Sequence, residues 1–379
     1  MIPLNNILND NKPWIEETWE KIVVKLRRNS EILKNKIPSV TTDGVYNDTS
    51  EKGISCWTNG FWPGIMWLMY DATGEEGFKE TAENAEKSLD RALKNFKSLD
   101  HDVGFLWHIS AGANYKLTGN EESKNRSLHA AATLASRYQA KGGFIRAWNW
   151  ESNAGWAIID CMMNLPLLYW ASEETKNEGF AQIADAHAKK TMENHIRPDG
   201  SAYHVVEYDN NTGEVIGYPW TQGYDKDTSS WARGQGWSIY GFILAYLHTK
   251  NKEYLDTAKK AAHYFIANVC STGYVPHHDF RQPDEPEIID TSAGAITACG
   301  LIEIAKAVPE FEQKMYMDAA VKIIKALTEK HCNWTEEEQS ILQNSSATYT
   351  SNVHRSHIYG EYFYVEAMYK LKGFDKLFW

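Results

Sequence analysis

The sequence predicts an all-α fold, an (α/α)6 barrel of six inner and six outer helices with a few short strands in loops. Three observations favour it. Hydrophobic residues make up 43% of the 379 residues, which is enough to bury a large core. A unit of one apolar and one amphipathic helix recurs along the chain. Turns within each unit are short, whereas connections between units are long. We therefore expect residues 1–379 to form a single domain.

The repeated unit accounts for most of the helices. Five copies occupy residues 64–93, 104–138, 158–194, 236–269 and 292–327. In each copy the first helix is apolar on nearly all sides, which is typical of a buried inner helix, and the second is apolar on one face only. Residues 359–373 supply the inner helix of a sixth pair, and residues 13–29 its outer helix. Pairing of these two segments closes the ring.

The long connections carry most of the unusual residues. They span residues 30–57, 140–154, 195–230, 270–291 and 332–358. Long loops at one end of a rigid ring are where a binding cleft is built. The stretch "GSAYHVVEYDNNTGEVIGYPW", residues 200–220, alternates as an extended hairpin does.

Composition excludes several classes of function. The net charge of −11 and the lack of a Lys/Arg-rich stripe argue against nucleic-acid binding. No apolar run reaches membrane-spanning length, and "MIPLNNILNDNKPW" does not read as a signal peptide. The five cysteines are scattered without a CxxC pair, so they indicate neither a disulfide framework nor a zinc site. We expect a cytoplasmic protein, a monomer or a weak homo-oligomer. The 15 Trp and 20 Tyr suit either sugar stacking or aromatic core packing.

Asp160 is the strongest candidate for a catalytic acid. It lies between the apolar runs "WAII" and "CMMNLPLL", with no basic residue within several positions. Burial without a partner raises the pKa of a carboxyl group, so Asp160 could hold a proton near neutral pH and donate it. The alternative is an Asp that caps a helix, which the apolar residues on both sides disfavour.

Asp102, in "LDHDVGF", has two interpretations that the residues alone leave open. It could cap the helix expected over residues 104–118. Alternatively, because the starts of successive inner helices point into one cleft, Asp102 and Asp160 could face each other. Paired carboxyls with separated pKa values are a common acid/base arrangement in glycoside chemistry.

Further candidates, for substrate binding, lie at the starts of inner helices or in the loops that lead to them. They are Trp57, Asn59, His101, Trp148, His204, Gln222, Arg233 and Trp237. Arg233 fits either a substrate carboxylate or a loop-holding ion pair. His204, His277 and His278 lack metal-ligand spacing, so we expect no metal and no other cofactor.

Five blocks of sequence resemble a known family. They are "LDHDVGFLW", "IIDCMMNLPLL", "WARGQGWSIYGF", "DTSAGAITACGLIEIA" and "YGEYFYVEA". In this order, from about Trp57 onward, they closely resemble the unsaturated glucuronyl hydrolases, glycoside hydrolase family 88. That family has the (α/α)6 barrel that the periodicity predicts.

The resemblance also implies a reaction. The substrates are oligosaccharides, typically disaccharides, that polysaccharide lyases leave with a 4,5-unsaturated glucuronic acid at the non-reducing end. The family hydrates the C4=C5 enol ether: a proton goes to C4, water adds at C5, and the hemiketal opens to release the sugar and a keto-uronate. Matching the two family aspartates makes Asp160 the acid/base and Asp102 its charged partner. The same matching places His204, Gln222, Arg233 and Trp237 around the uronate, and Trp57 and Trp148 as stacking platforms.

Some positions depart from the family pattern. Certain members that prefer sulfated disaccharides carry an Arg before the "WARGQGW" block and a Ser/Lys cluster near the C-terminus. This chain has Trp220 and Thr221 in the first place, and "TYTSNVHRSHIYG", with Arg355 but no Lys, in the second. The preference for sulfated or unsulfated substrates therefore stays open. The alternatives are an unsaturated rhamnogalacturonyl hydrolase acting on pectin fragments, which "HDVGF" disfavours, and a non-catalytic sugar-binding barrel, which Asp160 disfavours.

Overall fold

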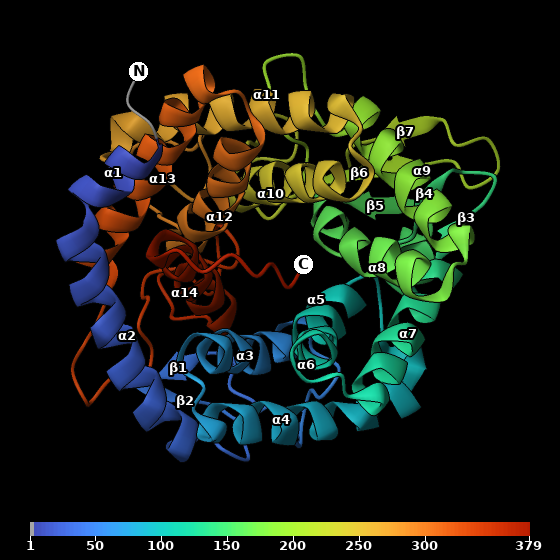
Figure 1. Ribbon diagram of the computed structural model, residues 1–379. Helices are drawn as coiled ribbons and strands as arrows, with labels where there is room; N and C mark the ends of the chain where they lie inside the picture. Colours follow the sequence, from blue (N-terminus) through green and yellow to red (C-terminus); the bar gives the residue numbers. More distant parts are fainter. Residues whose placement is uncertain (1–3) are drawn as a thin grey trace.

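A computed structural model, which describes residues 4–379, shows a closed (α/α)6 barrel and confirms the predicted fold class (Figure 1). The inner ring consists of α3 (Phe61–Thr73), α5 (Val103–Trp107) continued by α6 (Ala113–Thr118), α8 (Leu165–Thr175), α10 (Ala232–Thr249), α12 (Thr291–Ala307) and α14 (Ile358–Lys372). The outer ring consists of α2 (Lys12–Ile32), α4 (Glu76–Lys94), α7 (Glu121–Ser136), α9 (Glu178–Asn194), α11 (Lys252–Val269) and α13 (Glu310–His331). A short α1 (Leu4–Asp10) precedes them.

The remaining elements are short and lie in the connections. The strands are β1 (Thr41–Thr42), β2 (Val45–Tyr46), β3 (Tyr138–Gln139), β4 (Phe144–Ile145), β5 (Trp156–Ile158), β6 (Val205–Tyr208) and β7 (Val215–Gly217). The 3-10 turns are η1 (Trp57–Gly60), η2 (Phe96–Ser98), η4 (Glu151–Asn153), η5 (Ile159–Met163) and η6 (Cys270–Thr272), and η3 (His108–Gly112) is a π turn.

The same tight turn links four inner helices to their outer partners. In each, a Thr ends the inner helix and donates its hydroxyl to the carbonyl four residues earlier, as Thr118 does to Asn114 at 2.9 Å. A left-handed residue follows, for example Gly119 with φ of 74°. Asn120 then caps the outer helix, accepting from the backbone N–H of Glu122 and of Ser123. Corresponding turns begin at Thr73, Thr175 and Thr249, although the first has Glu75 in place of the capping Asn. These short turns make each helix pair antiparallel.

The ring closes where the two ends of the chain meet. α14 packs between α12 and α3, and α2 packs against α14 and α4. The C-terminus lies in the middle of the ring (Figure 1). There Trp379 stacks on Phe363 with ring centroids 5.8 Å apart and donates its indole N–H to Glu366 at 3.1 Å. Nearby, the buried Lys370 ammonium group pairs with Glu303 at 3.0 Å.

Two inner helices differ from the expected continuous segments. The helix expected from residue 158 begins only at Leu165, because residues 156–158 form a strand and residues 159–163 a 3-10 turn. Pairing of β5 with β6, a segment far along the chain, stabilises that extended stretch. The helix expected over 104–118 is interrupted by the π turn η3. The hairpin expected over 200–220 is present as β6 and β7, with β5 as a third strand.

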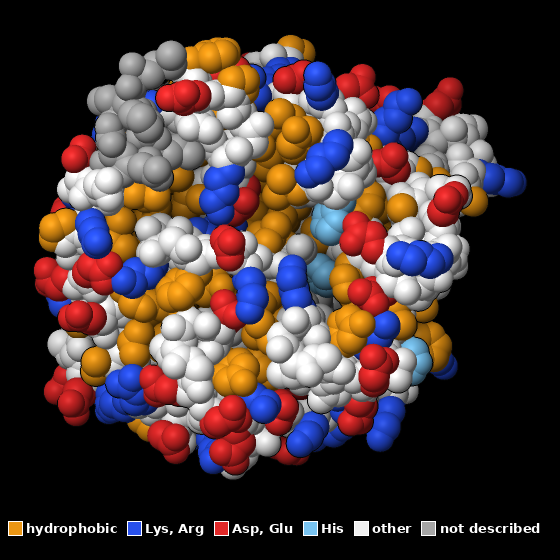
Figure 2. Space-filling model, in the orientation of Figure 1, with side chains coloured by type: hydrophobic (Ala, Val, Ile, Leu, Met, Phe, Trp, Pro, Cys, Tyr) orange, Lys and Arg blue, Asp and Glu red, His pale blue; other side chains and the backbone are white. Residues whose placement is uncertain are grey.

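Acidic and basic side chains are interspersed over the face of the molecule drawn in Figure 2, without a broad basic stripe on that face. Within residues 4–379, the structure contains no helix that is both long and apolar enough to cross a membrane.

Candidate active site

A cavity of about 340 Å³ opens among the loops that lead into the inner helices. Eight of the ten residues predicted from the sequence line it, namely Trp57, His101, Asp102, Trp148, Asp160, His204, Gln222 and Arg233. The loops over residues 30–57, 140–154, 195–230 and 332–358 all contribute to its walls. A groove of about 390 Å³ on the outer side of α2, beside Trp334, is lined mainly by charged side chains and by none of the residues predicted from the sequence. Only the loop-end cavity brings the predicted acid and its neighbours together.

Asp160 lies in the turn η5, directly after the β5–β6 pairing. Ile158 pairs with Val205, and the Ile159 N–H donates to the His204 carbonyl at 3.0 Å. This pairing brings the Asp160 carboxyl within 3.6 Å of the His204 ring, measured from Oδ2 to Nε2. Burial raises the pKa of Asp160 to about 7, although the Arg233 charge opposes the shift. The group therefore retains a proton near neutral pH.

His204 is neutral and its tautomer follows from its contacts. Burial lowers the pKa of His204 well below its ordinary value. Its Nδ1 accepts the backbone N–H of Gln222 at 3.0 Å, so the ring hydrogen of the neutral form is on Nε2. That N–H faces Asp160 Oδ2, which has no hydrogen-bond partner within residues 4–379. His204 can therefore donate to Asp160 after the carboxyl has lost its proton.

Asp102 precedes α5 but does not cap it among the described residues. Asn164 takes that role: its Oδ1 accepts the Phe105 N–H at 2.9 Å, and its Nδ2 donates to Asp102 Oδ1 at 3.1 Å. The close approach requires Gly104, since a Cβ there would lie 2.6 Å from Asn164 Oδ1. Because Asn164 satisfies the helix end, the Asp102 carboxyl is available to the cavity.

The two carboxyl groups interact. Burial, together with the neighbouring charges of Asp100 and Asp160, raises the pKa of Asp102 well above its ordinary value, while the Asn164 amide opposes the shift. Two buried carboxyls that repel each other do not both ionise readily. His101, whose Nε2 lies 3.6 Å from Asp102 Oδ1, is neutral because burial lowers its pKa well below the ordinary value.

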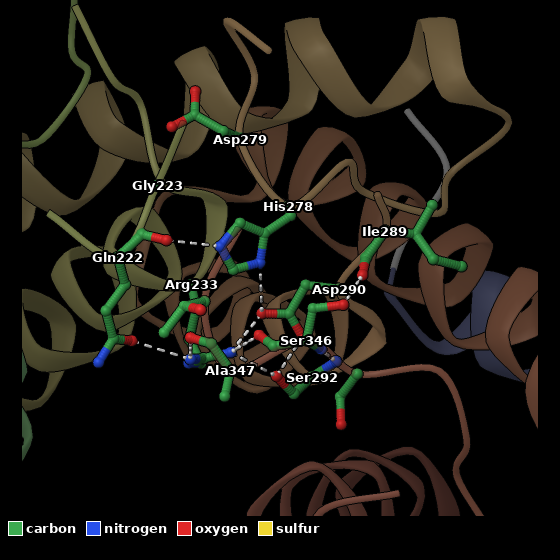
Figure 3. Close-up of polar contacts among 12 residues, drawn as sticks. Gln222, Gly223, Arg233, His278, Asp279, Ile289, Asp290, Ser292, Ser346 and Ala347 are labelled. Carbon is green, nitrogen blue, oxygen red and sulfur yellow. Dashed lines mark hydrogen bonds and ion pairs between the residues drawn. The ribbon is translucent and has the colours of Figure 1, made fainter. Parts of the chain in front are cut away.

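Arg233 both holds a loop (Figure 3) and lines the cavity. Its Nη1 donates to Asp290 Oδ2 at 2.5 Å and to the Ser346 carbonyl at 2.6 Å. Its Nη2 donates to the Gln222 side chain at 3.1 Å and to the Ala347 carbonyl at 2.7 Å. The loop-holding ion pair considered from the sequence is therefore present, and the same residue also lines the cavity.

The loop that carries Gln222 is fixed from behind. The His278 ring donates from Nε2 to the Gln222 carbonyl at 2.9 Å (Figure 3). Asp279 accepts the backbone N–H of Tyr224 at 3.0 Å and that of Ser230 at 2.9 Å. These contacts hold Gln222 beside both His204 and Arg233. The connection over residues 270–291 thus supports the cavity without lining it.

Asn59 and Trp237, also predicted to bind substrate, do not line the cavity. The Asn59 side chain donates to the carbonyls of Gly53 and Ile54, each at 2.9 Å, and accepts the Thr49 hydroxyl at 2.8 Å. It therefore clamps the loop before η1. Trp237 is fully buried on α10, and its indole N–H lies near enough to Asp160 to favour the anion, although its geometry falls short of a hydrogen bond among the described residues.

The family model of Glycosyl Hydrolase Family 88 matches residues 29–375. The chain belongs to Glycosyl Hydrolase Family 88. The resemblance inferred from the five sequence blocks is thereby confirmed, and the protein is a glycosidase.

Relatives and solved structures of family members are similar over nearly the whole chain. An unsaturated glucuronyl hydrolase of Bacillus sp. (strain GL1) is 38% identical over 359 residues, covering 91% of this chain and 93% of that protein. An unsaturated chondroitin disaccharide hydrolase of Streptococcus pneumoniae (strain ATCC BAA-255 / R6) is 34% identical over 380 residues, covering 97% and 94%. The crystal structure of the unsaturated glucuronyl hydrolase of Bacillus sp. GL1 matches with a TM-score of 0.88 at 36% identity, covering 95% of this chain and 97% of that one.

The sequence prediction missed several residues that line or support the cavity, among them Asn164 and Tyr359. Asn164 stands four positions after Asp160, but an Asn before "LP" reads as an ordinary helix start. Tyr359 lines the cavity, packs its ring 4.9 Å from Trp57 and holds a buried hydroxyl without a partner in the described part of the chain. Its place at the start of an inner helix after a long loop, the same rule that singled out Asp102, would have found it.

Proposed function

We propose that this family 88 glycosidase hydrates the C4=C5 bond of 4,5-unsaturated glucuronic acid at the non-reducing end of oligosaccharides left by polysaccharide lyases. The observation that carries the proposal is a buried carboxyl group that lines a sugar-sized cavity: burial raises the pKa of Asp160 to about 7. An enol ether needs such an acid, because the first bond made is between a proton and carbon. The relatives named for unsaturated glucuronyl and chondroitin disaccharide substrates support the same substrate class.

Asp160 acts first as general acid. Its proton goes to C4 of the unsaturated ring, and positive charge develops at C5 and the ring oxygen. The Asp160 carboxylate left behind accepts the His204 Nε2–H, which faces it. It then takes a proton from the water that adds at C5, so acid and base functions belong to one group. The hemiketal formed at C5 opens and releases the reducing-end sugar and a keto-uronate.

Asp102 acts as the charged partner of Asp160. The Asn164 N–H donated to its Oδ1 favours the ionised form of Asp102. In this proposal Asp160 carries a proton at the start of the reaction, and the negative charge on Asp102 stabilises the developing cation at C5. The remaining lining residues orient the ring: Arg233 and Gln222 bind the uronate, with His101 and His204, while Trp57 and Trp148 stack on sugar faces.

The test is a substrate panel followed by ultraviolet absorbance, since hydration destroys the C4=C5 chromophore. We expect absorbance loss with unsaturated disaccharides from hyaluronan, chondroitin or heparin. The unsaturated galacturonyl-rhamnose disaccharide of pectin should be a poor substrate. Intact absorbance with every glycosaminoglycan disaccharide would remove this function. Faster turnover of the pectin disaccharide would favour a rhamnogalacturonyl hydrolase instead.

Other properties belong to the same proposal. We propose a cytoplasmic enzyme of bacterial type, in which residues 1–379 act as one catalytic domain, as a monomer or weak homo-oligomer, without a nucleic-acid or membrane partner. Size-exclusion chromatography with light scattering tests the oligomeric state. A panel of sulfated and unsulfated chondroitin disaccharides tests the preference that Trp220 and Arg355 leave open.

A further inference from the structure

Asp290 forms an ion pair with Arg233 (Figure 3) but, unlike Arg233, does not line the cavity. Its Oδ2 lies 2.5 Å from Arg233 Nη1, and the two side chains are 0% and 3% exposed. No other carboxyl group of residues 4–379 forms an ion pair with Arg233. The remaining acceptors of the guanidinium group are a side-chain amide, a hydroxyl group and two backbone carbonyls, all of them neutral. The described chain therefore binds this cation with one negative charge, that of Asp290.

Helix capping and aromatic rings keep the ion pair in one position. Asp290 Oδ1 accepts the backbone N–H of Ser292 at 3.1 Å and thereby caps α12. The central carbon of the Arg233 guanidinium group lies 4.7 Å from the ring centroid of Trp231 and 5.2 Å from that of Tyr359. Because both partners are held by buried contacts, the cation has a fixed place in the cavity wall.

The charge of Arg233 acts on the acid of the proposed reaction. Burial raises the pKa of Asp160 to about 7, and the Arg233 charge opposes this rise. An unpaired guanidinium group at the same place would favour the ionised form of Asp160 more strongly. Opposite charges 2.5 Å apart largely cancel each other's field at larger distances, so the partner of Arg233 weakens its effect on Asp160.

The other titratable groups nearby cannot replace Asp290 in this role. Those that face Arg233, apart from Asp160 and Asp290, are His204, His278, His357 and Tyr359. Burial lowers the pKa of each histidine and raises the pKa of the tyrosine, so all four are neutral near pH 7. Asp160 is also faced by Asp102 and by Cys161. Burial raises the pKa of the Cys161 thiol well above its ordinary value, so it is neutral as well, and Asp102 acts on Asp160 rather than on Arg233.

We propose that Asp290 is a positioning residue that acts through Arg233: it neutralises the guanidinium group, so that Asp160 keeps its proton until the uronate carboxylate binds. The inference rests on the proposed function and assigns the pH range of the same site to this ion pair. Without the charge of Asp290, the cation would act on Asp160 unopposed, and Asp160 would ionise at a lower pH.

The experiment measures kcat/KM from pH 5 to 9 by absorbance loss on an unsaturated glycosaminoglycan disaccharide. Asp290→Asn keeps an acceptor that can cap α12 but carries no charge. We expect its alkaline decline to lie about one pH unit below that of the wild type. Asp279→Asn is the matched control: Asp279 is equally buried and holds the Tyr224 and Ser230 backbone through contacts that do not include Arg233. Its decline should stay at the wild-type pH even where its rate is lower.

A double variant tests the ion pair without leaving a lone buried charge. Arg233→Gln combined with Asp290→Asn replaces the pair with two neutral side chains. Its KM should rise, because Arg233 binds the uronate. Its alkaline decline should stay within about half a pH unit of the wild type, because a neutral pair then faces Asp160 in place of a neutralised one. Carbon-13 NMR of the Asp160 carboxyl group gives the same pKa where turnover is slow, and circular dichroism shows that each variant is folded.

The outcomes separate the role of Asp290 from the reaction itself. An Asp290→Asn decline at the wild-type pH, or a shift of the same size in Asp279→Asn, overturns the role while the hydration reaction stands. A larger displacement of the double variant in either direction also overturns it, and this result does not depend on the folding of Asp290→Asn alone. A wild type that leaves every unsaturated disaccharide intact overturns the proposed function, and the inference with it.

Discussion

Asp160 and Asp102 come from different repeats, and the amide of one residue, Asn164, contacts both stretches of chain. Asn164 Nδ2 donates to Asp102 Oδ1 at 3.1 Å and to the Asp160 carbonyl at 3.4 Å. One neutral side chain therefore links the carboxyl group of Asp102 to the backbone of Asp160.

The first prediction concerns the acid itself. Asp160→Asn keeps the shape of the side chain but removes its proton-donating and accepting functions, so kcat should fall by about 1,000-fold while substrate still binds. Rate is measured by absorbance loss and binding by calorimetry. Asp185→Asn makes the same chemical change on α9, where the carboxyl accepts the Tyr254 hydroxyl at 2.9 Å, and should leave kcat unchanged. An active Asp160→Asn enzyme would assign the acid to another group.

The second prediction is the pH dependence. Burial raises the pKa of Asp160 to about 7, and the protonated form is the active acid. The value of kcat/KM should therefore fall about tenfold per pH unit well above this pKa. Measurement of kcat/KM on unsaturated disaccharide from pH 5 to 9 tests for this decline. Activity that stays level to pH 9 would contradict a proton held by Asp160.

The third prediction tests Asn164 as a positioning residue. Asn164→Asp keeps an acceptor for the Phe105 N–H but replaces the donor to Asp102 with a second negative charge. The pKa of Asp102 should rise further, so kcat at pH 6 should fall about tenfold with little change in KM. Asn114→Asp is the control, because Asn114 donates to buried Glu86 at 2.8 Å away from the cavity. Asn114→Asp should lose thermal stability but keep the wild-type pH profile of kcat. A wild-type pH profile in Asn164→Asp would show that Asn164 does not position the charge of Asp102.

Single residues differ in how far their sequence context reveals them. Asp160 could be predicted because an isolated carboxyl in an apolar run has few structural reasons to be there. Asn59 was indistinguishable from a binding residue, since its loop-clamping contacts run to backbone carbonyls that no sequence pattern marks. Trp237 shares a motif with Arg233, but helix geometry buries it behind Asp160.

Elements that depend on local signals were predictable, and those that depend on distant pairing were not. The turns that join Thr118 to Asn120 and Thr249 to Asn251 consist of helix-ending and helix-capping residues that can be read directly. The strand β5 exists because Ile158 pairs with Val205, 47 positions later. That contact delays the start of α8 to Leu165 and places Asp160 in a turn rather than a helix.

At the scale of elements, Glu361 on α14 supplies a fourth prediction. Its Oε2 accepts the Tyr46 hydroxyl at 2.7 Å and the Ile341 N–H at 2.9 Å, joining two loops to the helix. Burial raises the pKa of Glu361 to about 7. Its contribution to stability is therefore complete below its unfolded pKa and is lost as pH rises through about 7, a cost of about 3 kcal/mol at high pH.

Glu361→Gln keeps an acceptor at the same place and carries no charge to bury. Its melting temperature should therefore decline less than that of the wild type between pH 5 and pH 8.5, as measured by calorimetry. The variant should be close to the wild type at pH 5. An equal decline in both proteins would show that Glu361 does not titrate in this range.

For the whole molecule, the repeat and its closure could be predicted, whereas the filling of the ring could not. Trp379 is 3% exposed and touches residues of several inner helices, including Phe105 and Tyr240 with ring centroids 5.9 and 6.2 Å away. Nothing in a terminal "KLFW" indicates that its last side chain reaches the centre of the barrel. The side chain of Trp379 reaches the centre of the barrel only when all the inner helices surround it.

The fifth prediction concerns this central residue. Trp379→Ala leaves a cavity and removes the N–H that Glu366 accepts, so the free energy of unfolding should fall by about 3–5 kcal/mol. Urea titration followed by circular dichroism measures it. The folded fraction should keep the wild-type kcat, since Trp379 does not line the cavity. An unchanged free energy of unfolding would show that Trp379 does not contribute to the stability of the barrel.

Closure of the ring by α14 and α2 also has a consequence in time. α14 packs on α3 and α2, segments roughly 300 positions earlier in the chain, so the inner wall cannot be completed until both ends have been synthesised. High sequence separation between contacts slows folding. Until the ring closes, four or five apolar inner helices of the nascent chain are exposed and can pair incorrectly. Consider a variant that is circularly permuted to join residues 379 and 4 and is opened in the turn after Thr249. In that variant the last helix pair to form would be α10 and α11 instead.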